Sequence, residues 1–153
     1  DKMTKDVLIS IRGLQFMSGD SLEDDADPVE VITVGEHYLK NGHHYIRYDE
    51  MFEGFADHAQ NLVKITDHVL EVRKKGVINV HMVFEENKKN IAYYTTPFGT
   101  MQMGIAATRV KVQEEQDHIG VRIEYALEIN EEHVGDCCLE MNIQSKETGD
   151  LAL

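Results

Sequence analysis

Methionine and aromatic residues lie on one face of each of three neighbouring segments, and among the residue patterns in the chain this one comes closest to a binding site. Met82 and Phe84 alternate along the first segment, Tyr94 lies on the second, and Met101 and Met103 follow on the third. Side chains two residues apart on a strand point to the same face. Thioethers adapt to irregular ligands and a tyrosine adds a polar hydroxyl. This pattern suits a site for a small, partly apolar molecule, but an ordinary core explains it better, because any barrel requires apolar inward faces.

Polar residues that could complete such a site lie on two segments. Tyr45, Arg47, Tyr48 and Glu50 are close together in the sequence and could make polar contacts at an opening. His81 sits between apolar neighbours and could point into an interior. The predicted ligand-binding residues are therefore Tyr45, Arg47, Tyr48, Glu50, His81, Met82, Phe84, Tyr94, Met101 and Met103.

Other chemistry has little support in the residue spacing. The eight histidines include no His-x-His or His-Glu-x-x-His spacing, so we predict no metal site. The acidic segment 20–27 is rich in the oxygen ligands that calcium prefers but lacks the spacing of a calcium loop, so we interpret it as a solvated loop. A Gly-x-Ser-x-Gly elbow and a phosphate-binding glycine loop are both missing. We predict no catalytic residue and no cofactor.

Charge and composition narrow the class of protein. The 153 residues carry 15 Lys and Arg against 28 Asp and Glu, a formal net charge of −13. Such a surface repels nucleic-acid phosphates and anionic membranes, so we expect neither as a partner. The apolar fraction of 42% is sufficient for an ordinary core. The sequence has no run of about 18 uncharged apolar residues, the length that could span a membrane as a helix.

The two cysteines suggest the compartment. Cys137 and Cys138 are adjacent, so on a strand they point to opposite faces and we interpret both as free thiols. Free thiols are typical of a reducing compartment. The first apolar stretch, 7–16, is interrupted by polar residues and does not resemble a signal peptide. These observations predict a cytoplasmic protein.

The elements that must position these residues are strands, because the dominant hydrophobic period is two. Between Ile119 and Ile129 every second residue is apolar, which is the pattern of a half-buried strand. Asn41-Gly42 has the sequence of a type I′ hairpin turn. We predict strands at 5–17, 29–40, 43–51, 58–66, 69–74, 77–86, 90–96, 99–114, 118–130 and 134–146. Apolar residues at helical spacing over 50–62 leave a short helical turn there as an alternative.

Bends in two strands suggest how the sheet closes. The apolar parity changes at Gly13 in the first strand and between Ala107 and Val110 in the eighth, which indicates bulges. Long bent strands joined by short turns can curl into a barrel, which buries one face and removes the edges. We predict a single all-β domain over 1–153, an antiparallel meander β-barrel of the calycin or lipocalin type with about 8–10 strands.

The order of segments resembles the YwiB-like family of bacterial proteins. The resemblance rests on Val7-Leu8-Ile9-Ser10-Ile11 with Gly13, on Gly35 with Tyr38, on Asn41-Gly42, on 45–50, on 82–85, on 94–99 and on 125–130. It covers about residues 5–146 and implies a calycin-like (lipocalin-like) barrel without an assigned activity. Where that family has a glycine followed by threonines, this chain has 57–61, so a role of those threonines does not carry over.

Three functional hypotheses follow. The first is a non-enzymatic protein that binds a small, partly apolar ligand in the barrel lumen or its mouth. The second is a structural or protein-interaction module with a packed core and no ligand, for which a homodimer is one form. The third is an enzyme with polar residues inside the barrel, for which His81 is the first candidate.

Overall fold

Ten strands make up the computed structural model, which describes residues 5–13 and 30–146. These residues contain no α-helix, and the all-β prediction is confirmed. The strands are β1 Lys5–Arg12, β2 Glu30–Lys40, β3 His43–Met51, β4 His58–Ile65, β5 Val69–Gly76, β6 Val80–Glu85, β7 Lys88–Thr96, β8 Gly99–Glu114, β9 His118–Ile129 and β10 Glu132–Ser145. The helical alternative for 50–62 is wrong, because β3 continues to Met51 and β4 already begins at His58.

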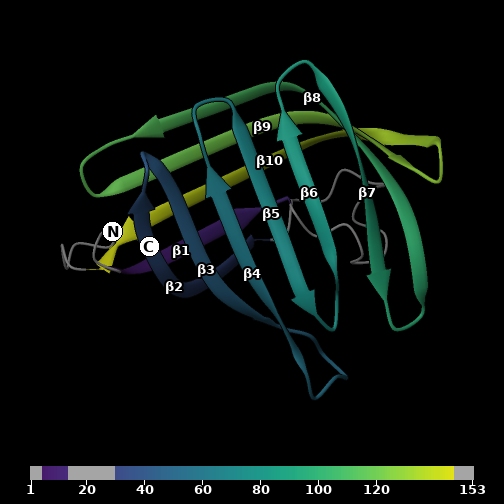
Figure 1. Ribbon diagram of the computed structural model, residues 1–153, viewed down its shortest axis with the longest axis horizontal. Helices are drawn as coiled ribbons and strands as arrows, with labels where there is room; N and C mark the ends of the chain where they lie inside the picture. The colour runs from purple at the N-terminus through teal and green to yellow at the C-terminus, as the bar shows by residue number, and fades with distance from the viewer. Residues whose placement is uncertain (1–4, 14–29, 147–153) are drawn as a thin grey trace.

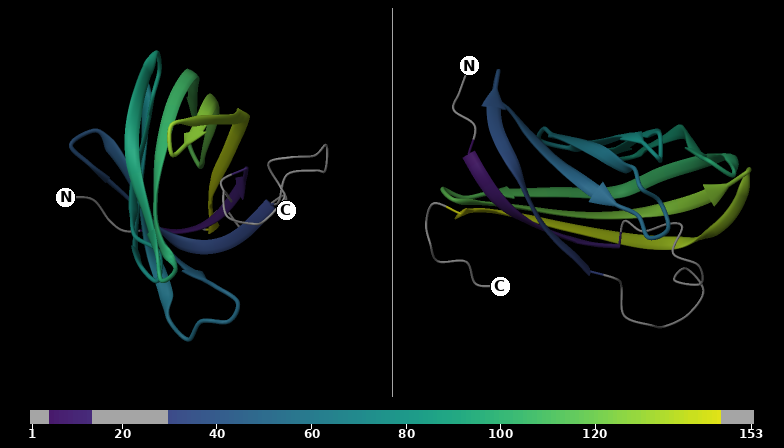
Figure 2. Two further views of the ribbon diagram at one scale, coloured as in Figure 1. Left: turned by 90° about the vertical axis from the view of Figure 1, so that its right-hand side faces the viewer. Right: turned by 90° about the horizontal axis from the view of Figure 1, so that it is seen from below.

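The strands form one antiparallel sheet that curls into a nearly closed barrel, as predicted. The order across the sheet is β6-β5-β4-β3-β2-β1-β10-β9-β8-β7, so β1 pairs with β10 and the seam lies between β6 and β7. In Figure 1, β8, β9 and β10 run along the long axis while β3 to β6 cross them obliquely. Figure 2 shows the strands curving round a shared interior. A backbone bridge between Asn79 and Thr95 joins the two sides of the seam.

Alternation explains how these residues form these strands. In β9, Ile119, Val121, Ile123, Tyr125 and Leu127 are all buried, as the period of two predicts. The bulge expected in the eighth strand is present, since the register between β8 and β9 shifts between Ala107 and Arg109. The bulge keeps both halves of this long strand facing the interior.

The hairpin turns and strand ends also follow from local sequence. Asn41 and Gly42 have φ values of 54° and 78°, the left-handed values that a type I′ turn requires. The predicted strand 77–86 begins later, at Val80, because Asn79 donates a 2.8 Å hydrogen bond to the carbonyl oxygen of Gly76 and closes a turn. The first strand ends at Arg12. The rest of its predicted range, 14–17, and the acidic segment 20–27 lie outside the described residues.

Large apolar side chains fill the centre of the barrel. The Phe84 ring meets the Tyr125 ring edge-to-face, with centroids 5.1 Å apart. Fully buried side chains come from strands all round the barrel: Ile9, Ile46, Ile65, Leu70, Met82, Phe84, Met103, Ile105, Ile123, Leu127, Leu139 and Met141. Burying side chains of this size contributes about 1.5–3 kcal/mol each, so the packed centre is the main source of stability.

Besides the seam between β6 and β7, the wall also opens between β2 and β3. The two strands pair only from Glu36–Arg47 to Lys40–His43, next to their turn. Beyond that point the first half of β2 continues beside β1, and the end of β3 continues beside β4. A Cβ atom on Gly35 would lie 2.5 Å from the carbonyl oxygen of Arg47, so glycine permits the close approach at the point of divergence.

Candidate functional site

The apolar residues predicted to contact a ligand do point into the barrel. Met82, Phe84, Tyr94 and Met103 are buried, and Met101 is partly buried against them. They pack into the filled centre described above. Their position inside the barrel is therefore as predicted, and a role in ligand binding stays a prediction.

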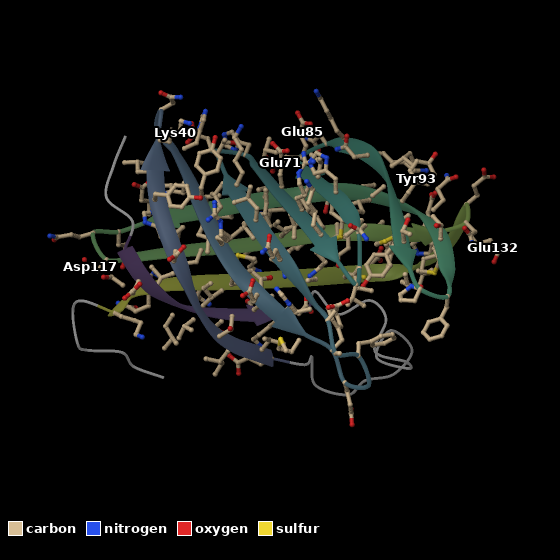
Figure 3. All side chains as sticks on the ribbon, turned by 60° about the horizontal axis from the view of Figure 1, so that its bottom comes forward. Lys40, Glu71, Glu85, Tyr93, Asp117 and Glu132 are labelled. Carbon is tan, nitrogen blue, oxygen red and sulfur yellow. The ribbon has the colours of Figure 1, made fainter. Side chains whose placement is uncertain are left out.

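The lumen position proposed for His81 is wrong. His81 lies on the outer face, where its Nε2 is 2.9 Å from Oε1 of Glu71. Val80, Met82 and Phe84 point inward, so the residue between the first two must point outward. Figure 3 shows Glu71 on this outer side of the sheet. His81 is therefore not a candidate catalytic residue inside the barrel, as the enzyme hypothesis required.

The polar group predicted at an opening is divided between the two faces of β3. Tyr48 and Glu50 point inward, whereas Arg47 is exposed on the outer face together with Tyr45. The Arg47 guanidinium donates a 2.6 Å hydrogen bond to the Tyr38 hydroxyl and lies over the Tyr38 ring. Residues 45 and 47 therefore cannot join residues 48 and 50 in one site, because neighbours on a strand face opposite ways.

A cavity of about 310 Å³ opens at the end of the barrel where the β2–β3 and β8–β9 turns lie, and we name it the histidine pocket. Figure 3 labels Lys40 and Asp117 at this end of the molecule. The pocket is lined by Val7, His37, Leu39, His44, Glu114, Glu115, Gln116, Asp117, His118, Ile119, Ile143 and Ser145. The lining includes four aliphatic side chains, and its three histidines, His37, His44 and His118, are buried or half-buried.

A chain of polar contacts crosses the histidine pocket. His37 Nε2 lies 2.9 Å from His44 Nδ1, and His44 Nε2 lies 3.1 Å from Oε1 of Glu114. An ionised carboxylate only accepts, so a neutral His44 carries its proton on Nε2 and accepts on Nδ1 from His37. The histidine rings stack with centroids 5.1 Å apart. The chain fixes the orientation of both rings at the edge of the pocket.

A second cavity, of about 230 Å³, occupies the split between β2 and β3, and we name it the lysine cleft. Its floor is a row of inward-facing residues, since Tyr48 pairs with Asn61 and Asn61 pairs with Lys74 across β3, β4 and β5. The cleft is lined by Ile11, Val31, Ile32, Thr33, Tyr48, Asp49, Glu50, Met51 and Lys74.

Lys74 is a buried cation with two partners. Only 5% of its side chain is exposed. Its Nζ donates a 2.7 Å hydrogen bond to Oε1 of Glu50 and a 2.8 Å hydrogen bond to Oδ1 of Asn61. Asn61 Nδ2 in turn donates to the same Glu50 oxygen at 3.2 Å. A buried charge requires this kind of compensation, because an unpaired ammonium in a low-dielectric interior is strongly disfavoured.

The surroundings of this ion pair change the acidity of two tyrosines. Burial raises the pKa of Tyr94 to about 12, and the negative charge of Glu50 acts in the same direction. The same two causes, in the same order, raise the pKa of Tyr48. Both phenols therefore stay protonated near neutral pH and are available as hydrogen-bond donors.

The cysteines agree with the sequence interpretation. Both are free; Cys137 is half-buried and Cys138 is exposed. Burial raises the pKa of the Cys138 thiol, and Arg122 opposes this while Glu140 adds to it. A raised pKa leaves the thiol protonated and unreactive.

The described residues contain neither a metal-binding cluster nor a membrane-spanning helix. Within 5–13 and 30–146, no group of three or more His, Cys, Asp or Glu side chains could hold a metal ion. In the same part of the chain, no helix has the length and apolar character needed to cross a membrane.

Sequence reasoning missed the polar residues that shape both cavities: His37, His44, Asn61, Lys74 and Glu114. A signal for two of them exists in the sequence. Lys74 shares the parity of Leu70 and Val72, and Asn61 shares that of Ala59 and Val63. A polar residue on an otherwise apolar face marks a buried polar contact, which in this protein belongs to the lysine cleft.

Comparison with known proteins identifies the family of this chain and a solved structure with the same fold. Residues 9–141 match the model of a domain of unknown function, DUF1934. The uncharacterized beta-barrel protein YwiB of Bacillus subtilis (strain 168) is 24% identical over 117 residues, which cover 75% of this chain and 78% of that protein. The crystal structure of the ywiB protein from Bacillus subtilis superposes with a TM-score of 0.70 at 18% identity, covering 94% of each chain.

Proposed function

The chain belongs to the DUF1934 family of β-barrel proteins, and from this premise we propose that it binds a small, partly apolar ligand without catalysis, in the histidine pocket at the mouth of the barrel. The main support for ligand binding at the mouth is the shape of the barrel interior. The centre is filled, whereas the mouth holds a cavity of about 310 Å³. Small-molecule pockets generally begin at about 300 Å³. The mouth therefore supports the ligand proposal and the filled centre does not.

The lining indicates what the ligand offers. Val7, Leu39, Ile119 and Ile143 supply an apolar wall, which favours a hydrocarbon or aromatic body. The histidine rings, together with Gln116 and Asp117, supply a polar side, which favours one polar group, such as a hydroxyl, on that body. A compact molecule with one polar end fits both features.

A pocket-filling variant tests the proposal, with p-cresol as the probe. Leu39→Phe adds a ring to the wall of the histidine pocket, and Leu62→Phe makes the same change on the outer face of β4. We expect p-cresol to raise the unfolding temperature of the native chain and of Leu62→Phe, and to have no effect on Leu39→Phe. Equal responses in all three proteins would overturn the proposal. Native mass spectrometry of freshly purified protein would show any ligand that is retained.

Exposed apolar residues on β2 favour a second candidate, a protein-interaction module. Ile32 and Val34 project from the outer face and are 54% and 56% exposed. Adjacent exposed aliphatic side chains are typical of contact surfaces. Light scattering at high protein concentration tests self-association. A dimer that dissociates in Ile32→Lys would support this candidate, and a monomer at all concentrations would contradict the homodimer.

The free thiols support a further part of the proposal, the compartment. Cys137 and Cys138 form no disulfide, which suits the reducing cytoplasm. Fractionation of cells that express the protein from its own gene would test this assignment.

A further inference from the structure

We propose that the lysine cleft is a second binding site, distinct from the histidine pocket, and that it takes the uncharged carboxamide group of a small molecule between Lys74 and Glu50. The proposal concerns a different cavity and a different chemistry from the function proposed above. It rests on unused hydrogen-bonding capacity, on burial and on the balance of charge in the cleft.

Three polar atoms in the lysine cleft have unused hydrogen-bonding capacity: Lys74 Nζ, Glu50 Oε2 and the Tyr48 hydroxyl. An ammonium group has three N–H donors, and Lys74 uses two of them, on Glu50 and Asn61. The hydrogen bonds that Lys74 and Asn61 donate to Glu50 both end on Oε1, so no described residue donates to Oε2. No group within 5–13 and 30–146 bonds to the hydroxyl of Tyr48, a residue that is only 5% exposed.

Burial makes this spare capacity significant. Lys74 and Tyr48 both lie against the cavity while being almost closed off from bulk solvent. Buried polar groups in proteins are nearly always satisfied by protein, water or ligand. A ligand in the cleft can therefore complete these hydrogen bonds in place of solvent, and it gains the contact with the cleft walls as well.

The charges in the cleft select an uncharged group. Lys74 and Glu50 form an ion pair at 2.7 Å and cancel. An anion would meet Glu50, the nearby Asp49 and a chain of net charge −13, while a cation would meet Lys74. A neutral carboxamide avoids both repulsions, because its oxygen accepts from Lys74 and Tyr48 and its NH₂ donates to Glu50.

Size and walls limit the rest of the ligand. A cavity of about 230 Å³ is smaller than a typical drug-sized pocket, so it holds one compact group. Ile11 and Val31 line it from β1 and β2 and supply apolar contact for a short hydrocarbon part. The open side lies along the split between β2 and β3, through which the ligand would enter.

Three probes of almost the same planar shape separate the possibilities: acetamide is neutral, acetate is an anion and acetamidinium is a cation. Binding is followed by NMR, through the Lys74 side-chain and Tyr48 ring signals of the full chain. We expect acetamide to bind the native chain at least about tenfold more tightly than either ion, because like charges a few ångströms apart repel by more than that factor in a partly buried site.

Charge-changing variants should reorder the probes in opposite directions. Glu50→Gln removes the negative charge, so acetate should become the tightest probe. Lys74→Met removes the positive charge, so acetamidinium should become the tightest. Glu71→Gln makes the same change as the first variant on the outer face of β5 and should keep the native order.

Several results would overturn the proposal. Acetate binding the native chain as tightly as acetamide would do so, as would an unchanged order in a folded Glu50→Gln protein. Failure of acetamide to move the Lys74 or Tyr48 signals at molar concentration would also do so. If neither charge variant folds, Tyr48→Phe decides the question, since it removes one hydroxyl and should weaken acetamide binding at least about threefold; unchanged binding overturns the proposal.

Discussion

Replacing Phe84 by alanine tests how tightly the centre of the barrel is packed. Phe84 is fully buried and meets the Tyr125 ring edge-to-face at 5.1 Å. A buried Phe→Ala change costs about 3–5 kcal/mol, and an aromatic pair adds about 0.5–1.5 kcal/mol. We therefore expect the free energy of unfolding to fall by about 3.5–6.5 kcal/mol. Since domains of this size have about 5–15 kcal/mol in total, the change should be large in a urea titration.

A ligand and a control variant sharpen this test. Phe84→Ala should leave a dry apolar hole in the centre, which benzene can enter. Benzene at about 100 times its dissociation constant should then restore about 2.7 kcal/mol to the variant. Phe98→Ala removes a ring that is 87% exposed and should change stability by no more than about 0.5 kcal/mol. A loss below about 1.5 kcal/mol in Phe84→Ala would refute the packed centre, since typical buried Phe→Ala losses are at least twice that.

Three further predictions concern the polar cluster, a close backbone approach and alkaline stability. Glu50→Ala should cost about 3–5 kcal/mol in urea unfolding because Lys74 is left buried without a counter-charge, and combining it with Lys74→Met should recover part of that loss. Gly35→Ala should lower the unfolding temperature, because its Cβ would lie 2.5 Å from a β3 carbonyl oxygen; Gly120→Ala, whose Cβ meets nothing closer than 3.4 Å, should be tolerated. The pKa of Tyr94 is raised from 10.0 to about 12, so the folded state holds this proton more tightly than the unfolded chain does. The resulting contribution to the free energy of unfolding should be fully present below about pH 10. It should decrease as the pH rises towards about 12, by at most about 1.4 kcal/mol per pH unit. Thermal unfolding at a series of pH values checks this, and a stability that rises over that interval would contradict it.

The strands were predictable because their signals are local. Alternation of apolar residues over 119–129 requires only the period of a strand, and the type I′ turn at Asn41-Gly42 requires only left-handed backbone angles. The bulge in β8 was likewise visible as a change of parity at Ala107. Closure of the barrel through β1 and β10 involves residues more than 120 positions apart, and it followed from the need to bury one face of the sheet.

The wrong orientation of His81 has a simple physical origin. In β6 the apolar residues occupy both parities, since Val83 is apolar as well as Met82 and Phe84. Even so, Val80, Met82 and Phe84 share one parity, so alternation favours the outer face for His81. A lumen position for His81 is incompatible with inward-facing Met82 and Phe84, because neighbours on a strand point to opposite faces. The burial of Val80 and Met82 decides the matter, and it depends on packing against other strands.

The two cavities depend on contacts between strands, which the sequence specifies only partly. The β2–β3 turn fixes the register that brings His37 beside His44, so this contact could have been found from the sequence. The contact of His44 with Glu114 crosses the mouth of the barrel and depends on its final curvature. The ion pair of Lys74 with Glu50 likewise joins strands that are not paired with each other.

An NMR titration of the isoleucine methyl groups with p-cresol tests most directly whether this barrel is filled at its centre and open at its mouth. Ile119 and Ile143 line the histidine pocket, whereas Ile105 and Ile123 lie fully buried in the centre. We predict saturable shifts of the Ile119 and Ile143 methyl signals, with the Ile105 and Ile123 signals unchanged. Shifts centred on Ile105 and Ile123 would contradict the account, because the ligand would then occupy an interior that we describe as full.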